Sequence, residues 1–223
     1  SDDDGLAISY DTGAGNDTLE YQWGGATNKY AVSMGAGDDK VLTGNMLATG
    51  DLLDGGDGTD ILGMSSAAAI AATALTGAAS TAYQALFSNF ETLGLGTNLV
   101  GDIDMAKLDG MNNLSLVGHG LASVAGLTSG ATITEDGTAG DWLTANIAGT
   151  GTADVLNVTL TSANGIGEAI AATGVETLNI ITTDTNTSAH WNWFDYNTPD
   201  ATSITVSGNA GVFISSASLA SGA

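Results

Sequence analysis

The chain contains no cysteine and only three basic residues, all of them lysines. Without cysteine it can form neither disulfides nor zinc–thiolate sites. Against the three bases stand 25 acidic residues, which give a formal net charge of −22. Nucleic acid is excluded as a partner, because phosphate contacts need a basic face. Anionic membrane surfaces are disfavoured for the same reason, unless a divalent cation bridges the two.

Proline and aromatic residues are also scarce, with Pro199 as the single proline and an aromatic share of 6%. Alanine is the most frequent of the hydrophobic residues, which make up 43% of the chain. Small side chains suit the narrow interior of a solenoid better than a thick globular core. The longest alanine-rich stretch, residues 67–87, is interrupted by polar residues, so the sequence predicts no membrane insertion.

Glycine, by contrast, is abundant and gathers in three similar turns at residues 13–17, 35–39 and 55–60. Each turn contains Gly-x-Gly-x-Asp, and a branched aliphatic residue comes two residues after this aspartate: Leu19, Val41 and Leu62. This is the pattern Gly-Gly-x-Gly-x-Asp-x-aliphatic-x, which binds calcium in parallel β-rolls. The glycines allow tight turns whose carbonyls can act as ligands, and Ca²⁺ prefers six to eight oxygens.

The spacing of the three turns predicts that they stack. Asp17 and Asp39 are 22 residues apart, and Asp39 and Asp60 are 21 apart, which fits one full coil per turn. Three stacked turns would enclose two cation sites. Two other interpretations stay open: coincidental glycine-rich surface turns, or a phosphate-binding loop. The second is disfavoured, because no basic residue follows any turn where a P-loop requires one.

A longer repeat of about ninety residues follows the predicted β-roll at residues 1–64. Residues 59–62, 90–95 and 114–118 are echoed by residues 153–156, 175–180 and 204–208, at offsets of 94, 85 and 90. We therefore expect residues 65–223 to continue the β-solenoid as two irregular repeats. Alanine-rich segments at 67–87 and 167–173 are predicted to form short helical insertions. The predicted fold class is all-β, a parallel β-roll or β-solenoid.

Several runs of residues resemble the C-terminal, calcium-binding region of the Caulobacter-type surface-layer (S-layer) proteins, which are RTX proteins. The similar runs are residues 34–39, 54–60, 90–93, 174–177, 183–187 and 207–211, in the same order. The resemblance implies type I secretion and a calcium-dependent two-dimensional lattice on the cell surface. If calcium holds the fold, we expect an extracellular location, because millimolar calcium there fills weak modular sites. No positively charged, apolar signal begins the sequence, which predicts either a fragment or export by a route that needs no such signal.

The resemblance also implies a set of calcium ligands: Gly13, Gly15, Asp17, Gly35, Gly37, Asp39, Gly56, Gly58 and Asp60. Asp57 in the third turn is a further candidate. Thr12 and Met34 stand where the repeat has its leading glycine. Asp154 is a further candidate, because it reproduces the Asp-x-aliphatic pattern, and Asp184 is another, beside Asn186. The pair Asp102 and Asp104 is a weaker one. The alternative for these loops is a solvated acidic surface.

The sequence predicts a structural protein rather than an enzyme. His119 and His190 are the only histidines, and no Gly-x-Ser-x-Gly motif is present. The segment 191–196 carries large rings on both faces of one extended stretch, so one face could meet another protomer or a cell-surface polysaccharide. The alternative is an insertion that folds its rings back onto the solenoid. Two alternatives therefore remain: an RTX adhesin or glycan-binding module, and the calcium-binding accessory domain of a secreted enzyme.

Overall fold

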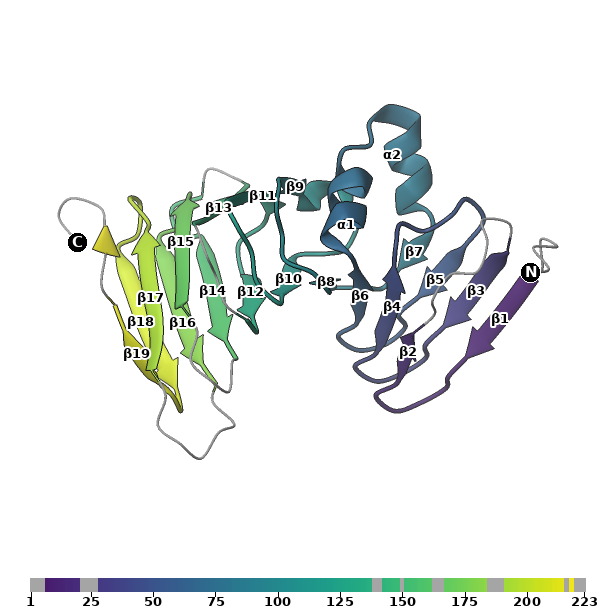
Figure 1. Cartoon of the computed structure of the whole chain (residues 1–223), viewed down its shortest axis with the longest axis horizontal. Helices are drawn as coiled ribbons and strands as arrows, with labels where there is room; N and C mark the ends of the chain where they lie inside the picture. Colours follow the sequence, from purple (N-terminus) through teal and green to yellow (C-terminus); the bar gives the residue numbers. More distant parts are fainter. Residues whose placement is uncertain are drawn as a thin grey trace. The chain divides into compact units, whose positions relative to one another are not determined.

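The chain folds as a parallel β-solenoid in the computed structural model (Figure 1), so the predicted fold class is confirmed. The structure describes residues 7–20, 28–137, 142–148, 151–161, 167–183, 191–214 and 217–218. Its contacts group the residues into two compact units: 1–96 with 107–111, and 97–106 with 112–223. The first unit thus extends beyond the β-roll predicted at 1–64.

Each coil of the first unit passes from one parallel sheet to a second. The first sheet has the order β1 (Ala7–Asp11), β3 (Lys29–Ser33), β5 (Leu52–Asp54), β7 (Phe87–Ser88). The second has β2 (Thr18–Glu20), β4 (Lys40–Gly44), β6 (Ile61–Met64), β8 (Thr92–Leu95). The aliphatic residues of the repeat lie in register, Leu19 beside Val41 and Val41 beside Leu62, and the last two are fully buried. Their burial forms the core of the roll.

Two short helices interrupt the last coil of this unit, between β6 and β7 (Figure 1). They are α1 (Ser66–Thr73) and α2 (Gly77–Gln84), so the predicted insertion at 67–87 is confirmed. Alanine favours the helix, and α1 buries Ala69 and Ala72. Tyr83 packs edge to face on Phe87 with 5.8 Å between ring centroids. Burial of the Tyr83 side chain raises the pKa of its phenol to about 12.

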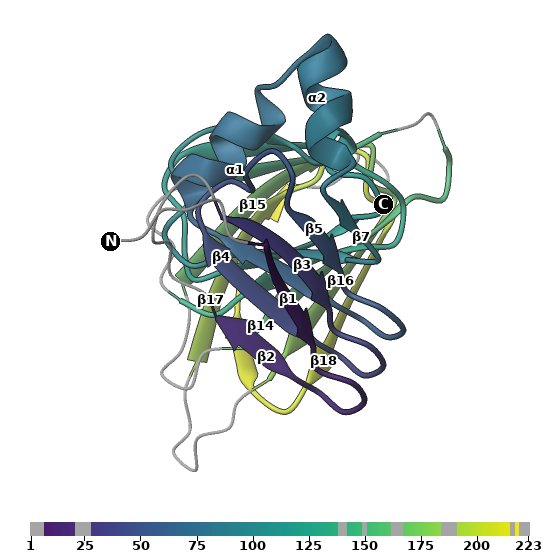
Figure 2. The ribbon, with the colours of Figure 1, turned by 90° about the vertical axis from the view of Figure 1, so that its right-hand side faces the viewer.

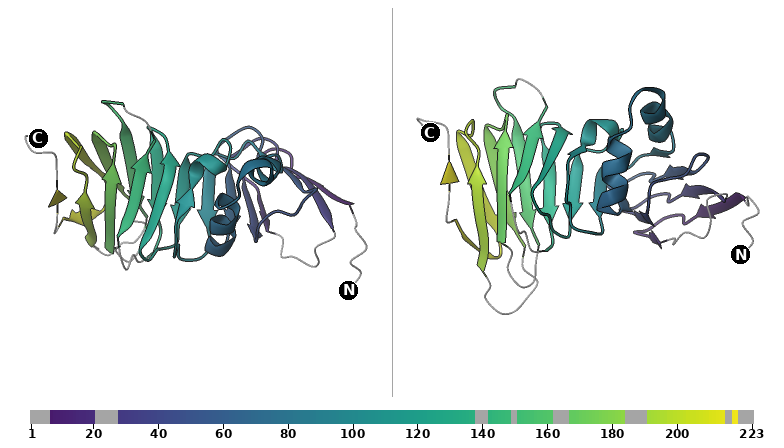
Figure 3. Two further views of the ribbon diagram at one scale, coloured as in Figure 1. Left: turned by 90° about the horizontal axis from the view of Figure 1, so that it is seen from above. Right: turned by 45° about the horizontal axis from the view of Figure 1, so that its top comes forward.

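The second unit is also built from two parallel sheets (Figure 3). One sheet contains β10 (Asn113–Leu116), β12 (Ala131–Glu135), β14 (Val155–Leu160), β16 (Thr177–Thr182) and β18 (Ser203–Gly208). The other contains β9 (Ile103–Asp104), β11 (Ala122–Leu127), β13 (Leu143–Ile147), β15 (Gly167–Thr173), β17 (Trp191–Asn197) and β19 (Gly211–Phe213), with β20 (Ala217–Ser218) also paired to β17. A 3-10 turn, η1 (Met105–Lys107), follows β9.

The prediction of a helix at 167–173 is wrong, because this segment is strand β15. It pairs in parallel with both β13 and β17, and Ile170 lies beside Leu143. Ile170 and Ala172 are fully buried. A seven-residue helix is marginal by itself, whereas a position between two strands pairs its backbone on both sides. Tertiary pairing therefore overrides the helix propensity of alanine.

Among the described residues, no helix is both long and apolar enough to cross a lipid bilayer.

Candidate metal centre

The three glycine turns lie side by side on one edge of the first unit, where β1, β3 and β5 pass into β2, β4 and β6 (Figure 2). The amide of Ala36 donates a hydrogen bond to the carbonyl of Gly13 at 2.9 Å. The amide of Asp57 donates to the carbonyl of Gly35 at 2.8 Å. Parallel bridges join Ala14 to Ala36 and Ala36 to Asp57. The stacking that the sequence spacing predicts is therefore present.

Glycine is required where one turn meets the next. Gly35 and Gly56 have φ values of +97° and +99°, a region that other residues rarely adopt. A Cβ on Gly35 would collide with the carbonyl oxygen of Gly13, and a Cβ on Gly56 with that of Gly35. The carbonyl oxygens of one turn therefore face the backbone of the next without an intervening side chain. Each of these carbonyl oxygens accepts one backbone hydrogen bond from the next turn. Carbonyl oxygens are also ligands of the kind that Ca²⁺ prefers.

Asp17, Asp39 and Asp60 form a column of carboxylates along the stacked turns, here called the carboxylate column. The Asp17 amide donates to Oδ1 of Asp39 at 2.7 Å, and the Asp39 amide donates to Oδ1 of Asp60 at 2.7 Å. Asp39 is 1% exposed and Asp60 is fully buried. The backbone of each turn thus fixes the carboxylate of the following turn.

The second oxygen of each carboxylate in the column has no hydrogen-bond partner. Oδ2 of Asp17, of Asp39 and of Asp60 are all buried. A buried carboxylate oxygen without a partner is costly, and such groups are normally paired or bound to a metal. The donor set therefore fits a calcium ion: carboxylate oxygens together with glycine carbonyls. No group of three or more His, Cys, Asp or Glu side chains that could hold a metal gathers among the described residues, so any ion at the column would also need carbonyl ligands.

The surroundings of Asp60 oppose the ionisation of its carboxyl. Burial raises the pKa of the Asp60 carboxyl above its ordinary value of 3.8, although the hydrogen bond from the Asp39 amide lowers it. The negative charges of Asp39, Glu91 and Asp38 raise the Asp60 pKa further. A divalent cation would offset both the burial and the repulsion.

A second row of hydrogen bonds runs beside the column. The Asp38 amide donates to Oδ1 of Asn16 at 3.0 Å, and the Thr59 amide donates to Oδ1 of Asp38 at 3.0 Å. These residues precede the aspartates of the column in each turn. Sequence reasoning missed this role, although a polar residue before the last aspartate of each turn signals it.

The structure places the remaining predicted ligands differently. Asp57 lies at the tip of its turn with an exposed side chain, outside the carboxylate column. Asp154 lies in the second unit and is half-buried. Its amide donates to Oε2 of Glu176 at 2.8 Å. Asp184 lies outside the described residues. Metal binding at these three positions stays a prediction.

Asp102 and Asp104 flank the buried Ile103 in β9. Asp102 is exposed, and Oδ1 of Asp104 accepts a hydrogen bond from the amide of Ala106 at 3.1 Å. One oxygen of Asp104 is therefore used to begin the 3-10 turn. Calcium binding by this pair also stays a prediction.

Glu91 is a further member of the stacked edge that sequence reasoning did not assign to the site. Its Oε2 accepts a hydrogen bond from the amide of Asp60 at 2.8 Å. The bond repeats the pattern within the carboxylate column, with glutamate in place of aspartate. The signal in the sequence was the Glu-Thr-Leu phrase that recurs at residues 176–178.

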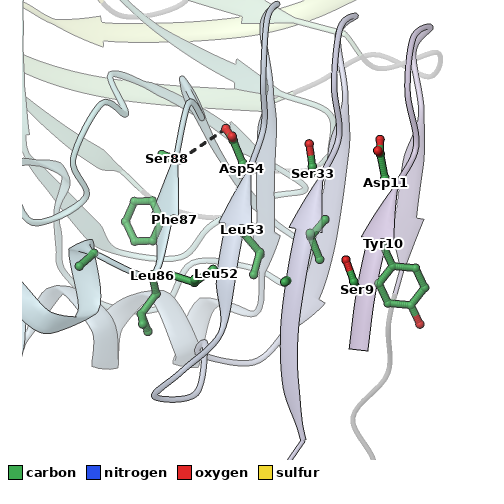
Figure 4. A pocket seen from close by; sticks show the side chains of 13 residues that line it. Ser9, Tyr10, Asp11, Ser33, Leu52, Leu53, Asp54, Leu86, Phe87 and Ser88 are labelled. Atoms are coloured by element: carbon green, nitrogen blue, oxygen red, sulfur yellow. Dashed lines mark hydrogen bonds between the residues drawn. The ribbon is translucent and has the colours of Figure 1, made fainter. Parts of the chain in front are cut away.

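An open groove crosses the first sheet of the same unit (Figure 4). Asp11, Ser33, Asp54 and Ser88 lie in one row across its strands. Oδ1 of Asp54 accepts hydrogen bonds from the side chains of Asn89, at 2.7 Å, and Ser88, at 3.4 Å. Asp54 thus links β5 to the chain after β7, and this row has a local structural role.

The aromatic segment has rings on both faces of β17, as the alternation of its residues predicts. Phe194 is fully buried and Tyr196 is 7% exposed. Trp193 is 56% exposed and lies beside Phe213 of β19, with ring centroids 4.7 Å apart. The inward rings fill the core, and the outward pair forms an exposed aromatic surface.

His119 lies inside the second unit with Glu135. Nε2 of His119 is 3.9 Å from Oε1 of Glu135, and both side chains are fully buried. Nδ1 of His119 lies 2.8 Å from the carbonyl oxygen of Gly120. Glu135 occupies a core position beside Leu116 and Leu160. The pair lies among core residues, and His190 lies outside the described residues.

The fold and the stacked edge define a class of protein, the parallel β-solenoid with glycine-rich turns. The sequence matches no protein-family profile, and it matches no curated protein.

Proposed function

We propose that this chain is the structural calcium-binding module of a secreted bacterial surface-layer protein, and that it assembles into a calcium-dependent two-dimensional lattice on the cell surface. The observation that supports it most directly is the carboxylate column, whose second oxygens are buried without a partner between stacked glycine turns. The resemblance of the repeats to S-layer RTX regions supports the lattice. In this proposal the chain is not an enzyme.

The residues of the edge have separate tasks in this proposal. Asp17, Asp39 and Asp60, with carbonyls of the turn glycines, would hold the ions. A bound Ca²⁺ would supply positive charge and link neighbouring turns. The backbone amides of Asp17 and Asp39 orient the carboxylates of the turns that follow. Extracellular calcium is plentiful enough to fill even weak modular sites, so folding would follow export.

A calcium titration followed by circular dichroism and light scattering tests the proposal. Calcium should increase β structure and melting temperature, because binding contributes to the free energy of folding. Scattering should rise with both calcium and protein concentration, and electron microscopy should show sheets. Equal β content and equal melting temperature in calcium and in chelator would contradict calcium binding. A folded monomer in millimolar calcium would contradict the lattice.

A second candidate function, glycan binding, is favoured by the exposed pair Trp193 and Phe213. Flat aromatic rings offer apolar contact to a neutral polysaccharide, which the charge of −22 does not repel. Trp193→Ala should abolish binding to cell-surface polysaccharide, whereas Trp142→Ala, at another exposed tryptophan, should retain it. Equal binding by both variants would exclude this surface.

A further inference from the structure

The last coil of the first unit enters its second sheet through a shortened turn. Residues 89–91 connect β7 to β8, whereas residues 55–60 connect β5 to β6. Asn89 has a φ of +55°, the only positive value among the described non-glycine residues. Phe90 is 1% exposed and fills the space beneath the turn. Glu91 directly precedes β8, as Asp60 directly precedes β6.

Glu91 extends the carboxylate column across this shortened turn. The Asp60 amide donates to Oε2 of Glu91 at 2.8 Å, just as the Asp39 amide donates to Oδ1 of Asp60 at 2.7 Å. Glutamate is one methylene longer than aspartate, so its carboxylate can reach the third turn from a shorter loop. Glutamate at this position thus preserves the column where the glycine-rich loop is missing.

Oxygen atoms also face the third turn from the side of the shortened turn. A Cβ on Gly55 would collide with the carbonyl oxygen of Asn89, so this carbonyl points at the third turn without an intervening side chain. The same Cβ would approach Oδ2 of Asp60 to 2.9 Å. That oxygen belongs to a fully buried side chain and has no hydrogen-bond partner. Gly55, Asn89 and Asp60 therefore bring two oxygens to one place.

We propose that Glu91 closes an additional calcium site between the third glycine turn and residues 89–91. Its ligands would be the carboxylates of Asp60 and Glu91 with the carbonyl of Asn89, all of them hard oxygens. This inference rests on the proposed function, since it assumes that the glycine turns bind calcium. The proposed site differs from a site between two glycine turns, because residues 89–91, with Glu91, form one side of it.

Glu176 provides a matched control within the same chain. Its Oε2 accepts a hydrogen bond from the Asp154 amide at 2.8 Å, and the preceding Gly174 and Val175 repeat the positive φ and the burial of Asn89 and Phe90. Asp154, however, is half-buried and is not among the described carboxylates with a buried, unpartnered oxygen. Glu176 therefore accepts the same kind of hydrogen bond as Glu91, but no buried, unpartnered carboxylate oxygen like Oδ2 of Asp60 accompanies it.

The experiment counts bound calcium ions on the full chain by native mass spectrometry and calorimetric titration with calcium chloride. Glu91→Gln should bind one ion fewer than the wild type, and Glu176→Gln should bind the wild-type number. An unchanged number for Glu91→Gln would overturn the inference. So would an equal loss in both variants, since that would reflect the removal of a negative charge in general.

Melting temperatures with and without chelator separate metal binding from a purely structural role. In Glu91→Gln the new side-chain amide oxygen can still accept the hydrogen bond from the Asp60 amide, so this variant should match the wild type in chelator and gain less on adding calcium. An equal loss of melting temperature in both conditions would make Glu91 a structural cap only. If the wild type bound no calcium, the proposed function would fail as well. If the wild type and Glu91→Gln bound the same number of ions, only the additional site would fail.

Discussion

The surroundings of the Asp39 carboxylate favour a bound cation. Asp39 is 1% exposed. Its Oδ1 accepts a hydrogen bond from the Asp17 amide, and its Oδ2 is buried without a hydrogen-bond partner. Asp38, the adjacent residue, is exposed and accepts one hydrogen bond from the Thr59 amide. The two neighbours thus have the same charge and similar hydrogen bonds, but they differ in burial and in the unpartnered oxygen.

Asp39→Asn should weaken calcium binding by about tenfold or more, because ligand charge sets the affinity of calcium sites. Asp38→Asn should change the dissociation constant by roughly threefold at most, as expected for an exposed charge. Isothermal titration of both variants checks this. Equal effects would show that general charge, rather than the carboxylate column, governs binding.

Alanine substitutions at Gly35 and Gly13 distinguish the cost of backbone strain from the cost of close stacking between turns. Their φ values are +97° and +88°, so alanine is strained at both by about 1–2 kcal/mol. A Cβ on Gly35 would collide with the Gly13 carbonyl, while a Cβ on Gly13 would meet nothing within 4 Å. Gly35→Ala should therefore lower the free energy of unfolding more, on the order of 3–4 kcal/mol in total. Urea denaturation in calcium checks this, and equal losses would argue against the stacked turns.

At the scale of elements, the same composition gives different structures in different surroundings. Residues 66–73 and 167–173 are both rich in alanine, yet the first forms α1 and the second forms β15. The first segment lies in an insertion between β6 and β7, where local propensity and capping decide. The second lies between β13 and β17, where backbone pairing on both sides decides.

The N-terminal cap of α1 allows the local contribution to the stability of this helix to be measured. The Ser65 side chain accepts a hydrogen bond from the Ala68 amide, whereas Thr76 before α2 makes no such bond. Ser65→Ala should reduce the free energy of unfolding by about 1 kcal/mol, and Thr76→Ala should cost less. Denaturation curves of both variants measure the difference. A larger loss for Thr76→Ala would contradict the described capping.

At the scale of the whole molecule, charge dominates. A formal charge of −22 with three lysines leaves most carboxylates without ion pairs, so self-repulsion destabilises the compact state. The stacked turns bring several of these carboxylates into one column, in which Asp39 and Asp60 are buried. Divalent cations and protons should therefore both stabilise the fold, by neutralising the same groups.

In chelator, stability should rise as the pH falls from neutral. The folded state raises the pKa of Asp60 above 3.8, so it binds this proton more tightly than the unfolded chain does. The gain appears as the pH falls through the raised pKa and levels off below 3.8, with a slope of at most about 1.4 kcal/mol per pH unit for this group. Asp60→Asn should show a smaller slope in urea denaturation at several pH values. The same slope in both proteins would assign the effect to other groups.

The sequence was a reliable guide to the architecture where its pattern is local and repeated. Glycine, aspartate and aliphatic positions 21 and 22 residues apart predicted coils, a stacked edge and a row of buried aliphatics. Leu19, Val41 and Leu62 lie in register as that pattern requires. The pattern works because each coil repeats the same contacts with its neighbour.

Long-range pairing decided what the sequence could not. It turned residues 167–173 into a strand, buried His119 with Glu135, and brought Glu91 to the Asp60 amide 31 residues earlier in the chain. None of these follows from propensity or spacing, because each depends on which coil lies beside which. The sequence by itself determined the repeat, the acidity and the residue types of the stacked turns. The tertiary structure decided which carboxylates are buried, oriented and left with an unpartnered oxygen, since burial and backbone donors come from the neighbouring coil.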